Sequence, residues 1–175
     1  MNYNKDIMDW TEFPAYDMIW TDPPWEERMV KLFHTMMRKD GYNPPVNTFV
    51  DIINQFAKLS DRSKPIVVEY GMKGYEKVIA IMKSKGHTHY KTIKGIQSMG
   101  RPFVLMTFNA DIDVNVTRKG GAIIVDTLMA RNEHTIFDPF AGIGFTAKAV
   151  RSAGKHYIGS ELNPKRFAQL QKVNT

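Results

Sequence analysis

Asp22-Pro23-Pro24-Trp25 is the first of two short segments whose residue types and spacing could perform chemistry. Two consecutive prolines fix the backbone and donate no N–H, so a carboxylate and a carbonyl face a constrained turn. These two acceptors suit an amine, and Trp25 offers a flat surface on which an extruded base could stack. The alternative is a rigid surface turn with a partly buried tryptophan.

The second segment, from His134 to Thr146, places Gly142 and Gly144 between an apolar run and a helical pattern. Glycine lets the backbone approach a ligand closely, and the start of a helix offers free N–H groups. Glu161 follows Gly142 at close to the spacing of about 20 positions at which an acid reaches ribose hydroxyls. Together these features predict a site for a nucleoside-containing cofactor. Because no third glycine completes a Gly-x-Gly-x-x-Gly pattern, a dinucleotide is disfavoured. The glycines alone would also fit a tight structural turn.

The elements that must position these residues alternate between apolar strand-like runs and helical patterns, which is typical of an α/β domain with a mainly parallel sheet. Strands are expected over residues 16–21, 65–70, 87–93, 102–108, 134–137 and 157–160, and helices over 26–38, 48–59, 74–85, 121–130, 146–152 and 164–173. The strands at 87–93 and 102–108 are expected to pair antiparallel through residues 95–100. Packing in the core is expected for residues on helical faces, mainly Met29, Met36, Phe49, Phe56 and Met82.

Length and composition favour a single domain over residues 1–175, with 43% hydrophobic residues for its core. No apolar run reaches the roughly 18 residues of a membrane span, and the polar N-terminus lacks a signal-peptide core. A soluble cytoplasmic protein of a prokaryotic or viral host cell, with no membrane partner, is expected. The chain has no cysteine, and its five histidines show no metal-ligand spacing, so no metal is expected. A net charge of +6 suits a nucleic-acid partner, although a solubilising surface explains it equally well.

Taken together, the motifs resemble those of β-class amino-methyltransferases of nucleic acids. Asp22-Pro-Pro-Trp is similar to their catalytic motif Asp-Pro-Pro-Tyr/Phe/Trp, and its Trp form to that of the mRNA adenosine methyltransferase branch. Phe137-Asp-Pro-Phe-Ala-Gly-Ile-Gly-Phe-Thr146 resembles their cofactor motif Asp-Pro-Phe-Xaa-Gly-Ser-Gly-Thr-Thr, and Tyr157-Ile-Gly-Ser-Glu161 the strand that follows it. Asn115-Val-Thr-Arg-Lys-Gly120 resembles their His-Pro-Thr-Gln-Lys-Pro segment. The catalytic motif comes first, as in the β class, and the resemblance spans about residues 16–167.

The chain departs from the family pattern at several positions. Ile143 and Phe145 stand where Ser and Thr are usual, and Asn115-Val116 and Gly120 replace His-Pro and Pro. Only residues 109–115 separate the last central strand from the Thr-Arg-Lys segment, where many β-class enzymes carry a target-recognition domain. The chain therefore resembles a compact form without that domain.

The resemblance implies an α/β Rossmann-like sheet of about seven strands, mostly parallel with one antiparallel strand, and helices on both faces. It divides the chain into a catalytic half at 16–110 and a cofactor half at 115–175. The implied activity is S-adenosylmethionine-dependent methylation of the exocyclic amine of adenine in DNA. Asp22 and the carbonyl of Pro23 would accept hydrogen bonds from the amine, in a turn shared with Pro24, and Trp25 would stack on the base. The cofactor would be bound by Lys119, Asp138, Phe140, Gly142, Gly144, Thr146, Glu161 and Asn163, with Glu161 on the ribose and Lys119 on the carboxylate.

Other readings of the sequence stay open. The substrate could be the amine of cytosine, for which Ser-Pro-Pro-Tyr is the commoner motif, adenine in RNA, or a small-molecule amine. A catalytically silent partner subunit is disfavoured because the acid of the catalytic motif is intact. Without a recognition domain, short or relaxed sequence specificity is expected, unless a homodimer or a separate specificity subunit supplies contacts. Candidates for contacts to the nucleic-acid backbone are Lys91, Lys94, Arg101 and Arg118.

Overall fold

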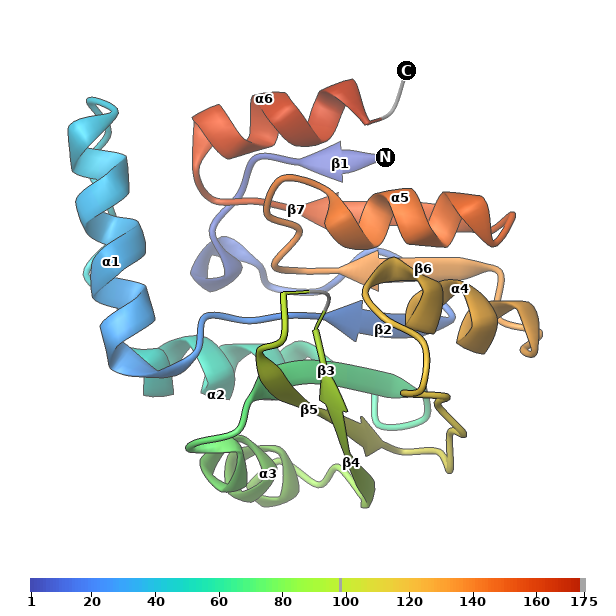
Figure 1. Cartoon of the computed structure of the whole chain (residues 1–175). Coiled ribbons are helices and arrows are strands. Elements are labelled where there is room, and N and C mark those ends of the chain that lie inside the picture. The colour runs from blue at the N-terminus through green and yellow to red at the C-terminus, as the bar shows by residue number, and fades with distance from the viewer. Residues whose placement is uncertain (98, 174–175) are drawn as a thin grey trace.

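The computed structural model, which describes residues 1–97 and 99–173, is built on a seven-stranded sheet (Figure 1). The strands are β1 (Asn2–Tyr3), β2 (Met18–Thr21), β3 (Ile66–Gly71), β4 (His89–Ile96), β5 (Pro102–Phe108), β6 (Thr135–Asp138) and β7 (His156–Ser160). Their order across the sheet is β1-β7-β6-β2-β3-β5-β4. Among the described strands, β5 alone runs opposite to the others, and it pairs antiparallel with both β3 and β4. The expected sheet is confirmed; residue 98 of the expected 95–100 connection and residues 174–175 of the expected domain lie outside the described residues.

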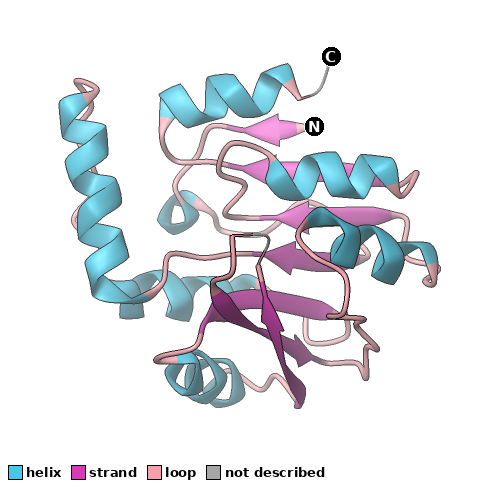
Figure 2. Cartoon of the chain, in the orientation of Figure 1, coloured by secondary structure: helices cyan, strands magenta, loops and turns pink. Residues whose placement is uncertain are grey.

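The helices begin and end close to their predicted bounds (Figure 2). They are α1 (Glu26–Lys39), α2 (Phe49–Leu59), α3 (Tyr75–Ser84), α4 (Gly121–Met129), α5 (Phe145–Ser152) and α6 (Pro164–Lys172). Local chemistry explains the starts of α2 and α6. Thr48 and Asp51 form a reciprocal capping box at α2, and Asn163 caps α6 just before Pro164. In the described part of the chain, no helix is both long and apolar enough to cross a membrane.

The N-terminal segment contains two elements that the sequence did not predict, β1 and the 3-10 helix η1 (Ile7–Asp9). Strand β1 extends the sheet beyond β7, with Asn2 opposite Gly159 and Tyr3 opposite Ser160. A strand of two residues shows no alternation of apolar and polar side chains. Its partner strand lies at the other end of the sequence, so no pattern within a short stretch of residues predicts the pairing.

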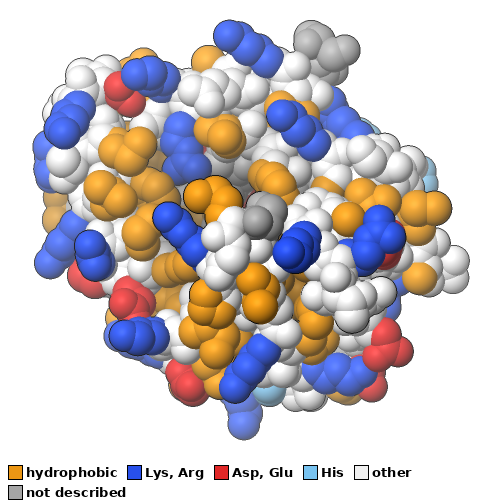
Figure 3. Space-filling view, in the orientation of Figure 1, with side chains coloured by type: hydrophobic (Ala, Val, Ile, Leu, Met, Phe, Trp, Pro, Cys, Tyr) orange, Lys and Arg blue, Asp and Glu red, His pale blue; other side chains and the backbone are white. Residues whose placement is uncertain are grey.

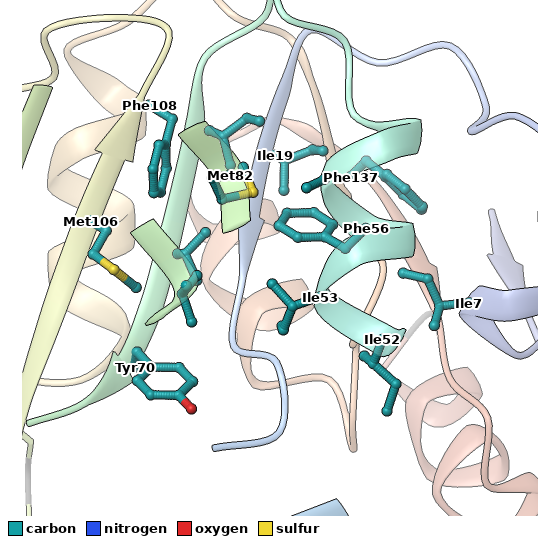
Figure 4. Close-up of a cluster of buried hydrophobic side chains, with 14 of the residues drawn as sticks. Ile7, Ile19, Ile52, Ile53, Phe56, Tyr70, Met82, Met106, Phe108 and Phe137 are labelled. Atoms are coloured by element: carbon teal, nitrogen blue, oxygen red, sulfur yellow. The ribbon is translucent and has the colours of Figure 1, made fainter. Parts of the chain in front are cut away.

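Helices cover both faces of the sheet and bury two apolar clusters. On one face α2 and α3 pack with Ile19, Val68 and Phe137 (Figure 4). On the other face α4 and α5 pack with Trp20 and Leu105. Because side chains alternate along a strand, β2 supplies both clusters and is fully buried, as expected for a central parallel strand. Of the residues expected in the core, Phe49, Phe56 and Met82 are buried, whereas Met29 and Met36 line a cavity.

Candidate active site

A cavity of about 500 Å³ lies at the carboxyl ends of β2, β3, β6 and β7. Strands β6 and β2 are neighbours, but the chain continues from β6 to β7 on one side and from β2 to β3 on the other. Open α/β sheets bind ligands at such a topological switch point. The cavity thus occupies the place where this fold builds its sites.

The two segments singled out from the sequence meet at this cavity. Ten of the twelve expected site residues line it: Asp22, Pro23, Pro24, Trp25, Asp138, Phe140, Gly142, Thr146, Glu161 and Asn163. The other two expected site residues, Gly144 and Lys119, do not line the cavity. Gly144 begins α5 and faces α6, since a Cβ there would lie 3.0 Å from side-chain atoms of Leu170 and Val173. Lys119 is exposed outside the cavity wall.

The Asp-Pro-Pro-Trp turn is fixed by contacts as well as by its prolines. The indole Nε1 of Trp25 donates to Asp22 Oδ1 at 2.7 Å. The ring lies against the backbone of β3, because a Cβ on Gly71 would approach it to 2.9 Å. Glu26 follows with φ of 60°, a strained conformation for a residue with a side chain, and its N–H donates to the Tyr70 hydroxyl at 2.7 Å. These contacts aim Asp22 into the cavity.

A second carboxyl group, Glu69 at the end of β3, lines the cavity beside Asp22. Enclosure by the cavity walls raises the pKa of Asp22 well above its ordinary value, and the nearby charge of Glu69 raises it further. Burial likewise raises the pKa of Glu69, against the hydrogen bond that Gln97 Nε2 donates to it at 2.8 Å. A negative charge on Glu69 therefore opposes ionisation of Asp22.

Asp138 connects the catalytic and cofactor segments. Its buried carboxylate accepts from the Thr21 hydroxyl at 2.7 Å, the Phe140 N–H at 3.1 Å and the Tyr157 hydroxyl at 3.4 Å. Burial nevertheless raises its pKa to about 6. Through these bonds Asp138 joins β2, β6, β7 and the glycine-rich turn. Its oxygens are thus engaged within the protein.

Glu161, just past β7, is buried at the cavity wall. Its Oε1 accepts from the Asn163 N–H at 2.8 Å, and burial raises its pKa. The N-terminal segment holds its backbone, because Glu161 N donates to Tyr3 O at 3.0 Å and Asn4 Nδ2 donates to Glu161 O at 2.7 Å. The Asn163 side chain is occupied in capping α6, so Glu161 is the acceptor that this strand presents to the cavity.

Helix α1 runs beside the carboxyl ends of the parallel strands and closes one side of the cavity (Figure 1). Two contacts join it to α6. The Arg166 guanidinium lies 4.9 Å from the Phe33 ring centre, and Lys165 Nζ lies 2.8 Å from Asp40 Oδ1. Arg166 also faces Glu161, whose pKa its positive charge lowers. This helix pair therefore brings a cation to a cavity that is otherwise rich in carboxyl groups.

Sequence reasoning missed Glu69, Gln97 and Arg166. Glu69 had a readable signal, because it is the charged residue of an otherwise apolar strand, just before that strand ends. The sequence carried no signal for Arg166, because basic residues are common on the exposed faces of helices. Gln97 belongs to a turn whose position over the cavity depends on the hairpin of β4 and β5.

The basic residues expected to contact nucleic acid divide into two groups. Lys91 forms ion pairs with Asp111 and Asp113, and Arg118 pairs with Asp126 at 3.6 Å. Arg101 lines the cavity, and Lys94 is exposed. Figure 3 shows Lys and Arg side chains spread over this face of the molecule, with hydrophobic side chains between them. Arg101 is therefore the basic candidate that the structure brings to the site.

Comparison with known proteins agrees with this architecture. A family model described as DNA methylase, of the N6/N4 methyltransferase type, matches residues 123–172. No curated protein matches the chain. Among solved structures, M1.HpyAVI superposes with a TM-score of 0.69 at 16% identity, over 99% of this chain and 98% of that one. TTHA0409, a proposed DNA modification methylase of Thermus thermophilus, gives 0.62 at 11% identity over 98% and 92%. The cytosine-N4-specific PvuII DNA methyltransferase gives 0.57 at 12% identity over 99% and 86%.

The fold is therefore a methyltransferase fold, shared along almost the whole length of these proteins. The segment matched by the family model contains the glycine-rich turn, β7 and Glu161. That segment supplies one wall of the cavity, while the Asp-Pro-Pro-Trp turn supplies another.

Proposed function

We propose that this chain is a compact β-class methyltransferase that uses S-adenosylmethionine to methylate the exocyclic amine of adenine in DNA. The observation that carries the proposal is that Asp22 and Glu161 open on one cavity at the switch point of the sheet. One presents an acceptor suited to an amine and the other an acceptor suited to a ribose. The matched family model and the fold support the same conclusion.

The cavity wall fits the cofactor chemically. Glu161 is a buried carboxylate beside open space, which suits the hydroxyl donors of a ribose. Gly142 has φ of 56°, a backbone conformation that favours glycine, and a Cβ there would displace the Arg166 guanidinium, from which it would lie 2.8 Å. Phe140 and Ile143 add apolar surface for the cofactor. When bound, S-adenosylmethionine supplies an electrophilic methyl group on a positively charged sulfur.

The protein's own contribution is to position the amine and increase its nucleophilicity. Asp22 accepts a hydrogen bond from the amine, and the carbonyl of Pro23 is the second acceptor. Asp22 must be ionised for this role, and the cation of Arg166 favours that state. Trp25 holds the carboxylate through its N–H and offers its ring to the base. No covalent intermediate with the enzyme is required.

Cytosine is the second candidate base, because the PvuII enzyme of similar fold is cytosine-N4-specific. The partner in this proposal is DNA. Its sequence is read only over a short or relaxed motif, because just residues 109–115 separate β5 from the Thr-Arg-Lys segment, where many β-class enzymes carry a target-recognition domain. A second copy of the chain or a specificity subunit would be the source of any longer recognition.

Mass spectrometry of nucleosides tests the activity after DNA is incubated with the protein and isotopically labelled cofactor. We expect labelled N6-methyl-2′-deoxyadenosine; labelled N4-methyl-2′-deoxycytidine would assign the substrate to cytosine, and no labelled nucleoside would refute the proposal. Asp22→Ala should abolish transfer while cofactor affinity stays within a few-fold. Glu12→Ala, which removes an exposed carboxylate away from the cavity, should leave transfer unchanged.

A further inference from the structure

Asp22 and Glu69 lie side by side on the same face of the sheet. In the parallel pairing of β2 with β3, Thr21 is opposite Val68, so Asp22 and Glu69 occupy the next register position. Neighbouring strands are about 4.8 Å apart, and side chains alternate between faces. Both residues therefore point to the face that buries Trp20 and Val67, where the strands reach the cavity.

Each of the two carboxyl groups is held by a neutral donor on one oxygen. Trp25 Nε1 donates to Asp22 Oδ1, and Gln97 Nε2 donates to Glu69 Oε1. Within the described residues, Asp22 Oδ2 and Glu69 Oε2 have no hydrogen-bond partner. The protein thus fixes the orientation of both groups and leaves one oxygen of each for a ligand.

Two carboxyl groups at adjacent positions of one cavity wall repel each other when both are ionised. This arrangement favours a single proton held between them. The other charged and titratable groups of the described residues around them are Lys5 and Asp6 before η1, His34 on α1, Tyr70 on β3, Arg101 before β5, Asp138 on β6, Glu161 after β7 and Arg166 on α6. Arg166 favours one negative charge at the pair, whereas Asp138 disfavours a second. The pair then offers one acceptor and one donor next to each other.

This arrangement matches the edge of a base that carries an amine beside an unprotonated ring nitrogen. That edge is amine and N1 in adenine, and amine and N3 in cytosine. We propose, on the basis of the proposed function, that Glu69 determines recognition of the target base. Its carboxyl group donates to the ring nitrogen, while the Asp22 carboxylate accepts from the amine. Gln97 is the positioning residue that holds Glu69 in this orientation.

Base analogues test this contact directly. An oligonucleotide with its target adenine replaced by 1-deazaadenine lacks the ring acceptor, whereas 7-deazaadenine retains it. Loss of this contact should lower kcat/KM of the wild-type protein about 10- to 150-fold for 1-deazaadenine, with little change for 7-deazaadenine. If the substrate is cytosine, 3-deazacytosine serves in the same way.

Variants of Glu69 show whether a slow rate with 1-deazaadenine comes from the lost contact to Glu69 or from the altered chemistry of the analogue itself. Glu69→Leu should be slow with adenine and lose most of the discrimination against 1-deazaadenine. Glu69→Gln keeps an N–H donor that cannot ionise, so it should retain the discrimination. Burial raises the pKa of Glu69, so the wild-type rate should also fall as the pH rises through that pKa and Glu69 loses its proton. Glu69→Gln should lack that fall.

Failure of this inference is distinguishable from failure of the proposed function. If the wild-type protein methylates ordinary DNA but treats 1-deazaadenine like adenine, or if Glu69→Leu still discriminates fully, the role of Glu69 is refuted. If the wild-type protein methylates no base, the proposed function itself fails. Calorimetric binding of S-adenosylmethionine to Glu69→Leu shows whether the variant is folded. If it is not, the pH profile of Glu69→Gln decides, because a fall in rate identical to that of the wild type would refute the role of Glu69.

Discussion

Replacement of Thr21 by valine should destabilise the protein by an amount that depends on pH. The Thr21 hydroxyl donates to Asp138 at 2.7 Å, and both residues are buried. Valine keeps the shape of threonine but removes this donor. A hydrogen bond to a charged group contributes about 1.5–3 kcal/mol, and one to a neutral group about 0.5–1.5 kcal/mol.

The direction of this pH dependence follows from the pKa of Asp138. Burial raises that pKa to about 6 in the folded protein, against roughly 3.9 in an unfolded chain. Burial makes the folded state hold its proton more tightly, so this group costs stability as the pH rises from about 4 to about 6. Thr21 offsets part of that cost because it favours the ionised form. Thr21→Val should therefore cost about 2–3 kcal/mol at pH 8 but only about 1 kcal/mol at pH 5. The difference corresponds to a further rise of about one unit in the pKa of Asp138.

Urea unfolding of the wild type and the variant at pH 5 and pH 8 measures this difference. Thr127→Val is the matched control, because the buried Thr127 hydroxyl donates at 2.8 Å to the backbone carbonyl of Ile123, which does not titrate. Its loss of unfolding free energy should be the same at both pH values. An equal loss for Thr21→Val at pH 5 and pH 8 would refute the coupling between Thr21 and the ionisation of Asp138.

Three further predictions concern the site. Glu161→Ala should weaken binding of S-adenosylmethionine about 10- to 150-fold in calorimetry, since a charge-assisted bond contributes about 1.5–3 kcal/mol; unchanged affinity would contradict the ribose assignment. Trp25→Phe keeps a ring but removes the donor to Asp22, so kcat should fall about fivefold with cofactor affinity unchanged; an unaltered kcat would show that the N–H does not position the acid. Methylation mapped on a plasmid library should reveal a short or relaxed motif, and a unique motif of about five or more base pairs from the purified chain would overturn that expectation.

Most of the sheet was predictable because its strands carry their own local signals. The apolar runs before Asp22 and Asp138 marked two parallel strands, and the motifs after them identified the fold. Glu161 was singled out because its spacing from Gly142 along the sequence corresponds to one unit of turn, helix and strand. Each of these signals lies within a short stretch of sequence.

The parts that were missed depend on contacts between distant segments. Strand β1 exists because Asn2 and Tyr3 pair with β7, and neither residue marks a strand by itself. Arg166 is part of the cavity because α6 folds back beside Phe33 of α1. The placement of Glu69 beside Asp22 required the register of β2 and β3, which side-chain alternation alone does not fix between strands.

The turn between β4 and β5 also bears on how such a protein could acquire new preferences. Its ends are joined by a bond from Gln97 N to Arg101 O at 2.8 Å, and Met99 and Arg101 line the cavity mouth. Each doubling in length of a flexible loop costs only about 0.6 kcal/mol in closure entropy, and hairpin tips accept insertions readily. An inserted loop here would extend the wall of the cavity mouth beside Arg101 while leaving the strands of the sheet in place. In the methyltransferase proposed above, target choice could therefore be changed by grafting a longer hairpin here, without altering the turns that carry Asp22 and Glu161.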